Sequence, residues 1–106
     1  MRAEKLRKVI KELLLNSEWN RNSDYALYAD YIKTMLPNEE STNYYNIMIN
    51  YKHFGIFSFK AVERTRRKIQ AEAYENGQEE LLSSKQVKRY RDELQKVYMA
   101  EFEEIG

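Results

Sequence analysis

Cysteine is absent from this chain of 106 residues, which contains only one proline and three glycines. Without cysteine the chain can form neither a disulfide framework nor a thiolate zinc site, and a reducing compartment is expected. The scarcity of glycine and proline argues against a β-architecture with many turns and favours a helical domain. No apolar run approaches the roughly 20 residues that span a bilayer, and no apolar signal core follows the basic N-terminus. We therefore expect a cytoplasmic protein without membrane contact.

The length fits a single domain over residues 1–106, with a modest core. The net charge of only +1 does not indicate a nucleic-acid ligand, but the charges are arranged in blocks. Residues 58–70 and 83–91 each carry a net charge of +4, whereas residues 71–82 and 92–106 each carry −4. Such blocks can place a basic face on a nearly neutral protein, or they can pair with one another across the folded surface.

Apolar residues recur at the spacing of an amphipathic helix in several parts of the chain, and we predict five helices. These helices cover residues 3–15, 24–36, 43–53, 59–75 and 84–104. The polar segments 16–22 and 37–42 are predicted connections, and Leu81 and Leu82 are expected to tuck into the core from a loop.

Capping residues stand at several of the predicted helix ends. Ser23 and Ser58 suit N-cap positions, because a serine hydroxyl accepts a hydrogen bond from a free amide of the first turn. Ser83, with Gln86 three residues later, has the pattern of a capping box. Gly77 is expected to end the fourth helix in the left-handed conformation that glycine adopts without strain.

The apolar stripes also predict which side chains form the core. The stripe of the second helix contains Tyr25, Tyr28, Ile32 and Met35. That of the last helix contains Val87, Tyr90, Leu94, Val97, Tyr98 and Phe102. Trp19 is expected to cover the edge of the core, since a large ring on an exposed loop would bury little surface. Of the nine tyrosines, Tyr45 and Tyr74 are expected nearest the surface.

The third and fourth predicted helices are joined by a short segment around Gly55, and this arrangement resembles a helix-turn-helix. In that motif the second helix lies in the major groove of DNA. Two helices joined at a glycine are also common in small helical domains that bind no DNA. We predict an all-α, single compact domain of four to five helices with a helix-turn-helix-like centre.

Basic residues on the predicted helix 59–75 are the main functional candidates. Lys60, Arg64, Arg67 and Lys68 are expected to contact duplex DNA, with arginine suited to the guanine edge and both residue types to phosphate. A second cluster at the start of the last helix would supply backbone contacts through Lys85, Lys88 and Arg89. Glu63 on the same face opposes phosphate binding, and a solvated helix face without any ligand shows the same pattern.

An enzyme is not expected. His53 is the only histidine, and without cysteine it cannot complete a familiar zinc site. The adjacent acidic pairs point apart on a helix, so they do not form an acid–base pair. A glycine-rich phosphate loop is also missing. We therefore predict no catalytic residues, no metal and no cofactor.

Two segments resemble a group of small phage and prophage proteins of Gram-positive bacteria. The longer segment, residues 58–70, has the form S-x-x-x-V-x-R-x-R-R-K-I-Q, in which Arg66, Ile69 and Gln70 are among the matching positions. The shorter segment contains Arg21, Ser23 and Asp24. The resemblance implies a phage-encoded protein that acts in the cytoplasm of the host cell, and it implies no mechanism.

These observations lead to two functional hypotheses. The first is a phage-encoded DNA-binding or regulatory protein that lays the basic helix against duplex DNA. The alternative is a phage interaction protein that inhibits a host enzyme or defence complex, in the manner of an anti-CRISPR protein, without binding DNA. A homodimer through the last helix is a further expectation, because helix-turn-helix proteins often pair.

Overall fold

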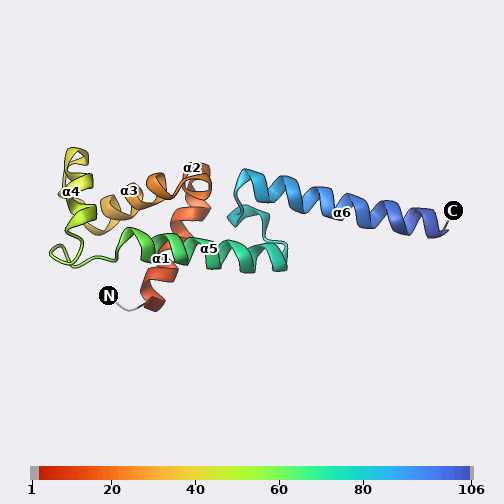
Figure 1. Ribbon diagram of the computed structural model, residues 1–106, viewed down its shortest axis with the longest axis horizontal. Coiled ribbons are helices and arrows are strands. Elements are labelled where there is room, and N and C mark those ends of the chain that lie inside the picture. Colours follow the sequence, from red (N-terminus) through yellow and green to blue (C-terminus); the bar gives the residue numbers. More distant parts are fainter. Residues whose placement is uncertain (1–2, 106) are drawn as a thin grey trace.

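The computed structural model describes residues 3–105, and its regular structure is entirely helical (Figure 1). Over that range the chain forms six α-helices, two short 3₁₀-helices and no strand. The α-helices are α1 (Ala3–Asn16), α2 (Glu18–Asn22), α3 (Asp24–Met35), α4 (Tyr44–Ile49), α5 (Phe59–Asn76) and α6 (Ser84–Ile105). The 3₁₀-helices are η1 (Ser41–Asn43) and η2 (Glu79–Leu81). The predicted all-α class is confirmed.

Helices α1, α3 and α5 pack against one another and enclose most of the core (Figure 1). The stripe of α1 lies inward as its spacing predicts, with Leu6, Ile10 and Leu14 buried. The other core side chains come from α3, α4, α5 and η2, and they include Leu27, Tyr31, Ile32, Ile47, Val62, Ile69 and Leu81. The core is therefore a helix bundle in which α5 contacts both α1 and α3.

The predicted connection 16–22 contains the short helix α2, which sequence periodicity did not indicate. Its inward side chain is Asn20, which donates hydrogen bonds from Nδ2 to the Leu13 carbonyl at 3.0 Å and to Asp30 Oδ2 at 2.8 Å. Trp19 points the other way and is 79% exposed. The prediction that Trp19 covers the core edge is wrong, because α2 turns a polar residue inward in its place.

The prediction that Tyr25 belongs to the buried stripe of the second helix is also wrong, because its side chain is 71% exposed. Tyr28 and Ile32 are buried as the stripe predicts, and Leu27 and Tyr31 are buried beside them, so the inward face of α3 is centred away from Tyr25. The ring of Tyr25 packs on the outside of Phe59 with the ring centroids 5.1 Å apart.

The predicted helix-turn-helix centre is not confirmed. Helix α4 ends at Ile49 rather than at residue 53, and residues 50–58 separate it from α5, whereas the motif uses a turn of about 3–4 residues. Gly55 does adopt a positive φ of 69°, as expected for a turn glycine. The connection is fixed to α3 at Phe57, whose carbonyl accepts from the Tyr28 hydroxyl at 2.8 Å and whose amide donates to the Tyr31 hydroxyl at 3.0 Å.

The predicted ends of α5 and the start of α6 are confirmed. Ser58 Oγ accepts a hydrogen bond from the Ala61 amide at 3.1 Å, and Gly77 follows the helix with a φ of 68°. The capping box forms both of its bonds: the Ser83 amide donates to Gln86 Oε1 and the Gln86 amide donates to Ser83 Oγ. Leu81 and Leu82 are buried, as expected for a loop tucked into the core.

Helix α6 projects from the bundle, and the molecule measures 64 × 26 × 19 Å as a result (Figure 1). Its first turns touch the body through the half-buried Val87 and Tyr90. The later apolar side chains that were predicted to be buried are all exposed, namely Leu94, Val97, Tyr98 and Phe102. Periodicity identifies the apolar face of a helix, but it does not determine whether another element covers that face.

The two glycines with positive φ give a matched test of how Gly77 positions α6. A Cβ at Gly55 would meet no atom within 4 Å, whereas a Cβ at Gly77 would lie 2.7 Å from the Tyr90 hydroxyl. We expect Gly55→Ala to lower the free energy of unfolding by about 1 kcal/mol through backbone strain alone. Gly77→Ala should cost more and should also shift the ring resonances of Tyr90.

Urea denaturation and NMR spectra of both variants would measure these effects. Equal destabilisation by the two substitutions, with unchanged Tyr90 resonances in each, would contradict the proposed contact between Gly77 and Tyr90.

Candidate nucleic-acid interface on helix α5

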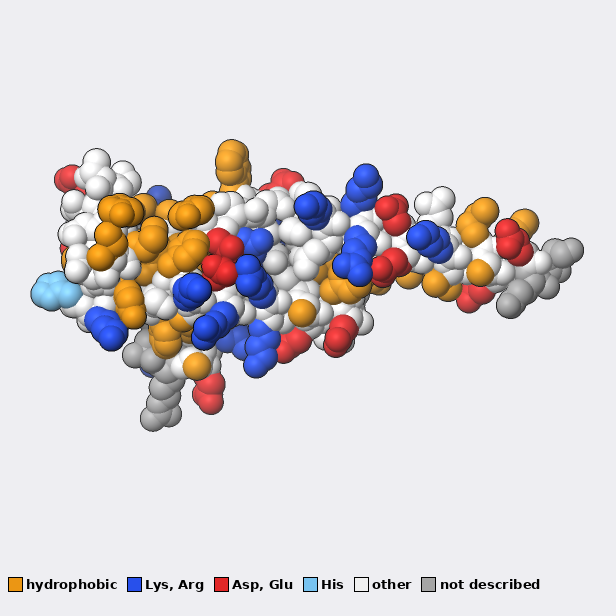
Figure 2. Space-filling view, viewed as in Figure 1, with side chains coloured by type: hydrophobic (Ala, Val, Ile, Leu, Met, Phe, Trp, Pro, Cys, Tyr) orange, Lys and Arg blue, Asp and Glu red, His pale blue; other side chains and the backbone are white. Residues whose placement is uncertain are grey.

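The basic residues of the first half of α5 lie together on its outer face. The helix docks through Val62, Ile69 and Ala73, which are buried, so residues displaced from that stripe face solvent. The exposed residues on this outer face are Lys60, Arg64, Arg67 and Lys68, here called the basic row. Figure 2 shows lysine and arginine side chains gathered over the region where Figure 1 draws α5.

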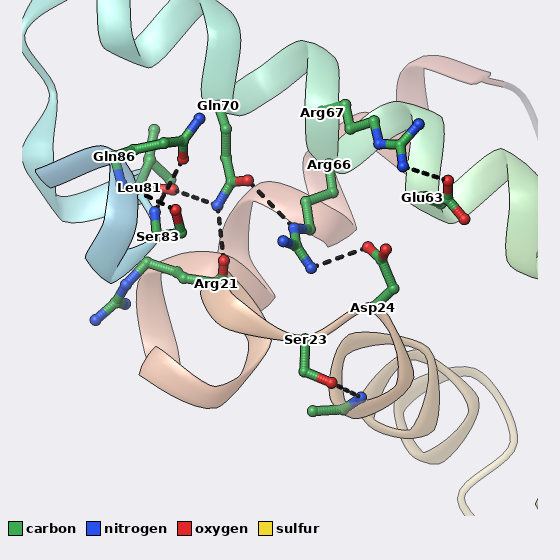
Figure 3. Close-up of polar contacts among 11 residues, drawn as sticks. Arg21, Ser23, Asp24, Glu63, Arg66, Arg67, Gln70, Leu81, Ser83 and Gln86 are labelled. Atoms are coloured by element: carbon green, nitrogen blue, oxygen red, sulfur yellow. Dashed lines mark hydrogen bonds and ion pairs between the residues drawn. The ribbon is translucent and has the colours of Figure 1, made fainter. Parts of the chain in front are cut away.

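Most of the basic row is free of ion pairs. Lys60, Arg64 and Lys68 form none with any residue of the described range 3–105. Arg67 pairs with Glu63 one turn earlier, at 2.8 Å, but its side chain remains 72% exposed (Figure 3). An exposed ion pair of this kind contributes little stability, so the Arg67 guanidinium can exchange this partner for another anion.

Unlike the exposed basic residues beside it, Arg66 points toward the body of the protein. Its side chain is only 15% exposed and donates to Asp24 Oδ1 at 2.9 Å and to Gln70 Oε1 at 3.2 Å (Figure 3). Gln70 is buried and donates in turn to two carbonyl oxygens, those of Arg21 and Leu81, at 3.1 Å each. These contacts, here called the Arg66–Gln70 network, connect α5 to the start of α3, to α2 and to η2.

The network joins the two segments on which the phage resemblance was noted. Asp24 and the Arg21 carbonyl belong to the shorter segment, and Arg66 and Gln70 belong to the longer one. Ser23 in the same place caps α3 by accepting from the Ala26 amide at 3.2 Å. Arg66 and Gln70 of the distinctive segment therefore hold the fold together. Helical periodicity could not reveal this role, because Arg66 and Asp24 are 42 positions apart.

The second basic cluster lies beside the C-terminal half of α5. Lys85 and Lys88 are exposed and form no ion pair with residues 3–105. Arg89 pairs with Glu93 at 3.2 Å and lies over the Tyr74 ring at 5.7 Å. Arg89 also shares a shallow hollow with Ala71 of α5. Since Ala71 is one turn beyond the basic row, this hollow, which Glu75 also lines, places Arg89 next to the row. Lys88 instead lines a separate hollow with Glu79 and Asp92.

Opposite charge blocks do pair across the folded surface: Arg7 of α1 pairs with Glu72 of α5, and further pairs form at the base of α6. Arg91 donates to both carboxylate oxygens of Glu79 at 3.1 Å, and these hydrogen bonds lower the pKa of Glu79 below its usual value. The Tyr74 hydroxyl bonds to Glu93, which lowers the pKa of that carboxylate and raises the pKa of the tyrosine. None of the seven candidate DNA contacts takes part in the Glu79 pair, so this pairing leaves the basic row unaffected.

Two other kinds of feature, metal-binding clusters and membrane-spanning helices, were sought over residues 3–105. No three histidine or acidic side chains in that range are grouped so that they could hold a metal ion. Each helix there is too short or too polar to cross a lipid bilayer. The chain matches no family model, no curated protein and no solved structure.

Replacing Gln70 tests whether the network is structural. Gln70→Leu removes the donors of two buried carbonyl groups, so we expect the free energy of unfolding to fall by about 2–3 kcal/mol. Arg67→Ala on the outer face should change it by less than about 0.5 kcal/mol. Chemical denaturation of both variants would measure the difference, and a Gln70→Leu protein as stable as the parent would contradict this assignment.

The base of α6 should loosen in acid. The pKa values of Glu79 and Glu93 are lower in the folded protein than the value of 4.5 for a free glutamate. The contribution of these carboxylates to stability is therefore complete above pH 4.5, and it is lost as the pH falls through their folded-state pKa values. We expect the protection factors of the amides of residues 84–93, which correct for the intrinsic pH dependence of exchange, to fall over that range. A Glu79→Gln/Glu93→Gln variant should already exchange faster at neutral pH. Protection factors that stay equal in the two proteins from neutral to acidic pH would refute this account.

Proposed function

We propose that this protein is a DNA-binding regulatory protein that lays the outer face of α5 against the phosphate backbone of a duplex. The single observation that carries the proposal is the basic row, in which Lys60, Arg64 and Lys68 are exposed and without carboxylate partners in residues 3–105. A phage-encoded regulator of host or phage genes would fit the sequence resemblance noted above.

The dimensions of the basic row suit contacts to several phosphates of one strand. From Lys60 to Lys68 the helix rises by about 12 Å, which corresponds to roughly three to four nucleotides at about 3.4 Å each. Lysine acts there as a point charge, whereas Arg64 and Arg67 can each grip a phosphate through two parallel hydrogen bonds. Contacts of this kind position a protein on DNA without reading the sequence of bases.

Sequence readout requires at least one side chain that reaches the base edges. Arg64 is the best candidate, because it occupies the middle of the basic row and has no ion-pair partner in the described range that would compete with guanine. Arg89 extends the surface beyond Ala71, and the exposed Lys85 and Lys88 in the first turns of α6 are further candidates for phosphate contacts.

A second candidate function is an interaction protein that inhibits a host enzyme or defence complex without binding DNA. The observation in its favour is the exposure of Trp19, since tryptophan is enriched where protein partners bind most strongly. In this case the basic row would contact an acidic surface of the partner.

The salt dependence of duplex binding tests the first proposal. We expect affinity for a duplex of about 20 base pairs to fall steeply as salt rises, because each neutralised phosphate releases counterions. Lys60→Ala/Arg64→Ala/Lys68→Ala should weaken binding and reduce the logarithmic salt slope by about 2–3, at about 0.9 for each lost contact. Fluorescence anisotropy over a series of salt concentrations would measure both quantities.

The matched control removes three exposed lysines from α1, in the variant Lys5→Ala/Lys8→Ala/Lys11→Ala. This variant loses the same net charge, so a specific site on α5 predicts a much smaller change in the slope. Equal losses in the two triple variants would show that the attraction is diffuse. No binding at about 50 mM salt would exclude DNA and favour the interaction protein.

A further inference from the structure

An exposed but supported aromatic ring stands at the start of α5, next to the basic row. The ring belongs to Tyr25 of α3 and packs on Phe59, the first residue of α5, with the ring centroids 5.1 Å apart. Phe59 makes an edge contact with Tyr28 at 5.5 Å, and Tyr28 lies against Tyr31 at 5.7 Å. Tyr25 is the outermost of these four residues, here called the ring stack, so its ring is supported on one side and open to solvent on the other.

The inner members of the ring stack are anchored in the core. Tyr28 and Tyr31 are both buried. The Tyr28 hydroxyl donates to the Phe57 carbonyl at 2.8 Å, and the Tyr31 hydroxyl accepts from the Phe57 amide at 3.0 Å. These bonds fix the segment that leads into α5 and, with it, the ring on which Tyr25 rests. A ring held in this way loses little conformational freedom when a flat ligand stacks on its open face.

Two acidic residues lie between the ring and the basic row, and both are neutralised. Asp24 precedes Tyr25 and pairs with Arg66 at 2.9 Å. Glu63, one turn along α5 from the ring stack, pairs with Arg67 at 2.8 Å. Figure 2 shows hydrophobic side chains over α3 close to the basic side chains over α5, with acidic side chains between the two groups. A phosphate that passes from the basic row to the ring is therefore not repelled by an unpaired charge on either carboxylate.

An open aromatic ring beside phosphate-binding side chains suits an unpaired base. Within a duplex each base is covered on both faces by its neighbours, so a ring outside the double helix cannot stack on it. An unpaired base can turn toward the ring, and stacking then tolerates any base because every base has a π-face. The exposed Lys60 directly follows Phe59, so a strand whose phosphates follow the basic row to its N-terminal end arrives at Tyr25.

We propose that Tyr25 is a stacking platform for an unpaired base, and that the preferred ligand of this surface is DNA in which a duplex adjoins a short single-stranded segment. The inference rests on the proposed function, because the basic row must supply the phosphate contacts on the adjoining duplex. Stacking on Tyr25 adds the ability to distinguish interrupted DNA from an intact duplex. It does so without reading the sequence of bases.

Two DNA ligands that differ only in a gap test the proposal. The first is an intact duplex of about 30 base pairs, and the second lacks about three central nucleotides of one strand, which leaves thymidines unpaired on the other. Electrostatic attraction alone predicts weaker binding to the gapped ligand, because it carries fewer phosphates. Stacking of one base predicts the opposite order, with the gapped ligand bound about 5- to 150-fold more tightly. Fluorescence anisotropy at one salt concentration would measure both affinities.

Three variants assign the preference for the gapped ligand to one ring. Tyr25→Ala should lower the affinity for the gapped ligand to that for the intact duplex, whereas Tyr25→Phe keeps a ring and should keep the preference. The matched control is Tyr45→Ala, because Tyr45 on α4 is 73% exposed but lies outside the ring stack, and this variant should also keep the preference. Circular dichroism would confirm that all three proteins stay folded, as expected for exposed positions.

The failure of this inference and the failure of the proposed function give different results. Equal affinity of the parent protein for the two ligands overturns the stacking inference and leaves the proposed duplex binding intact. A preference that survives in Tyr25→Ala, or that is lost equally in Tyr45→Ala, also overturns it, because the ring is then not the cause. Binding to neither ligand at about 50 mM salt contradicts the proposed function itself, and the inference with it.

Discussion

The partly buried bond between Arg66 and Asp24, together with the bonds of Gln70, fixes the rotation of α5 about its own axis. One cation of a strongly basic helix is turned inward and neutralised there, and the amide next to it joins two further segments. With Arg66 held inward, the helical geometry places Arg64, Arg67 and Lys68 outside. The Arg66–Gln70 network and the buried stripe of Val62, Ile69 and Ala73 together sort the charges of α5 into structural and exposed ones.

The end of α5 determines the exposed face of α6 in the same way. Gly77 in the left-handed conformation stops the helix, and η2 carries the chain back to the body, where Leu81 and Leu82 are buried. The capping box at Ser83 then starts α6 in a direction that carries it beyond the end of α5. Because α5 is too short to follow it, the apolar face of α6 is covered only at Val87 and Tyr90.

The features that could be predicted from the sequence are those whose causes lie within a few residues. The cap at Ser58, the glycine at position 77 and the capping box each involve neighbours no more than four positions away. The exposure of the basic row followed from helical spacing. The partner of Arg66, the inward turn of Asn20 in place of Trp19, and the bare face of α6 depend on segments far apart in the chain. Periodicity carries no information about those contacts, so the candidate site was located while the network supporting it was missed.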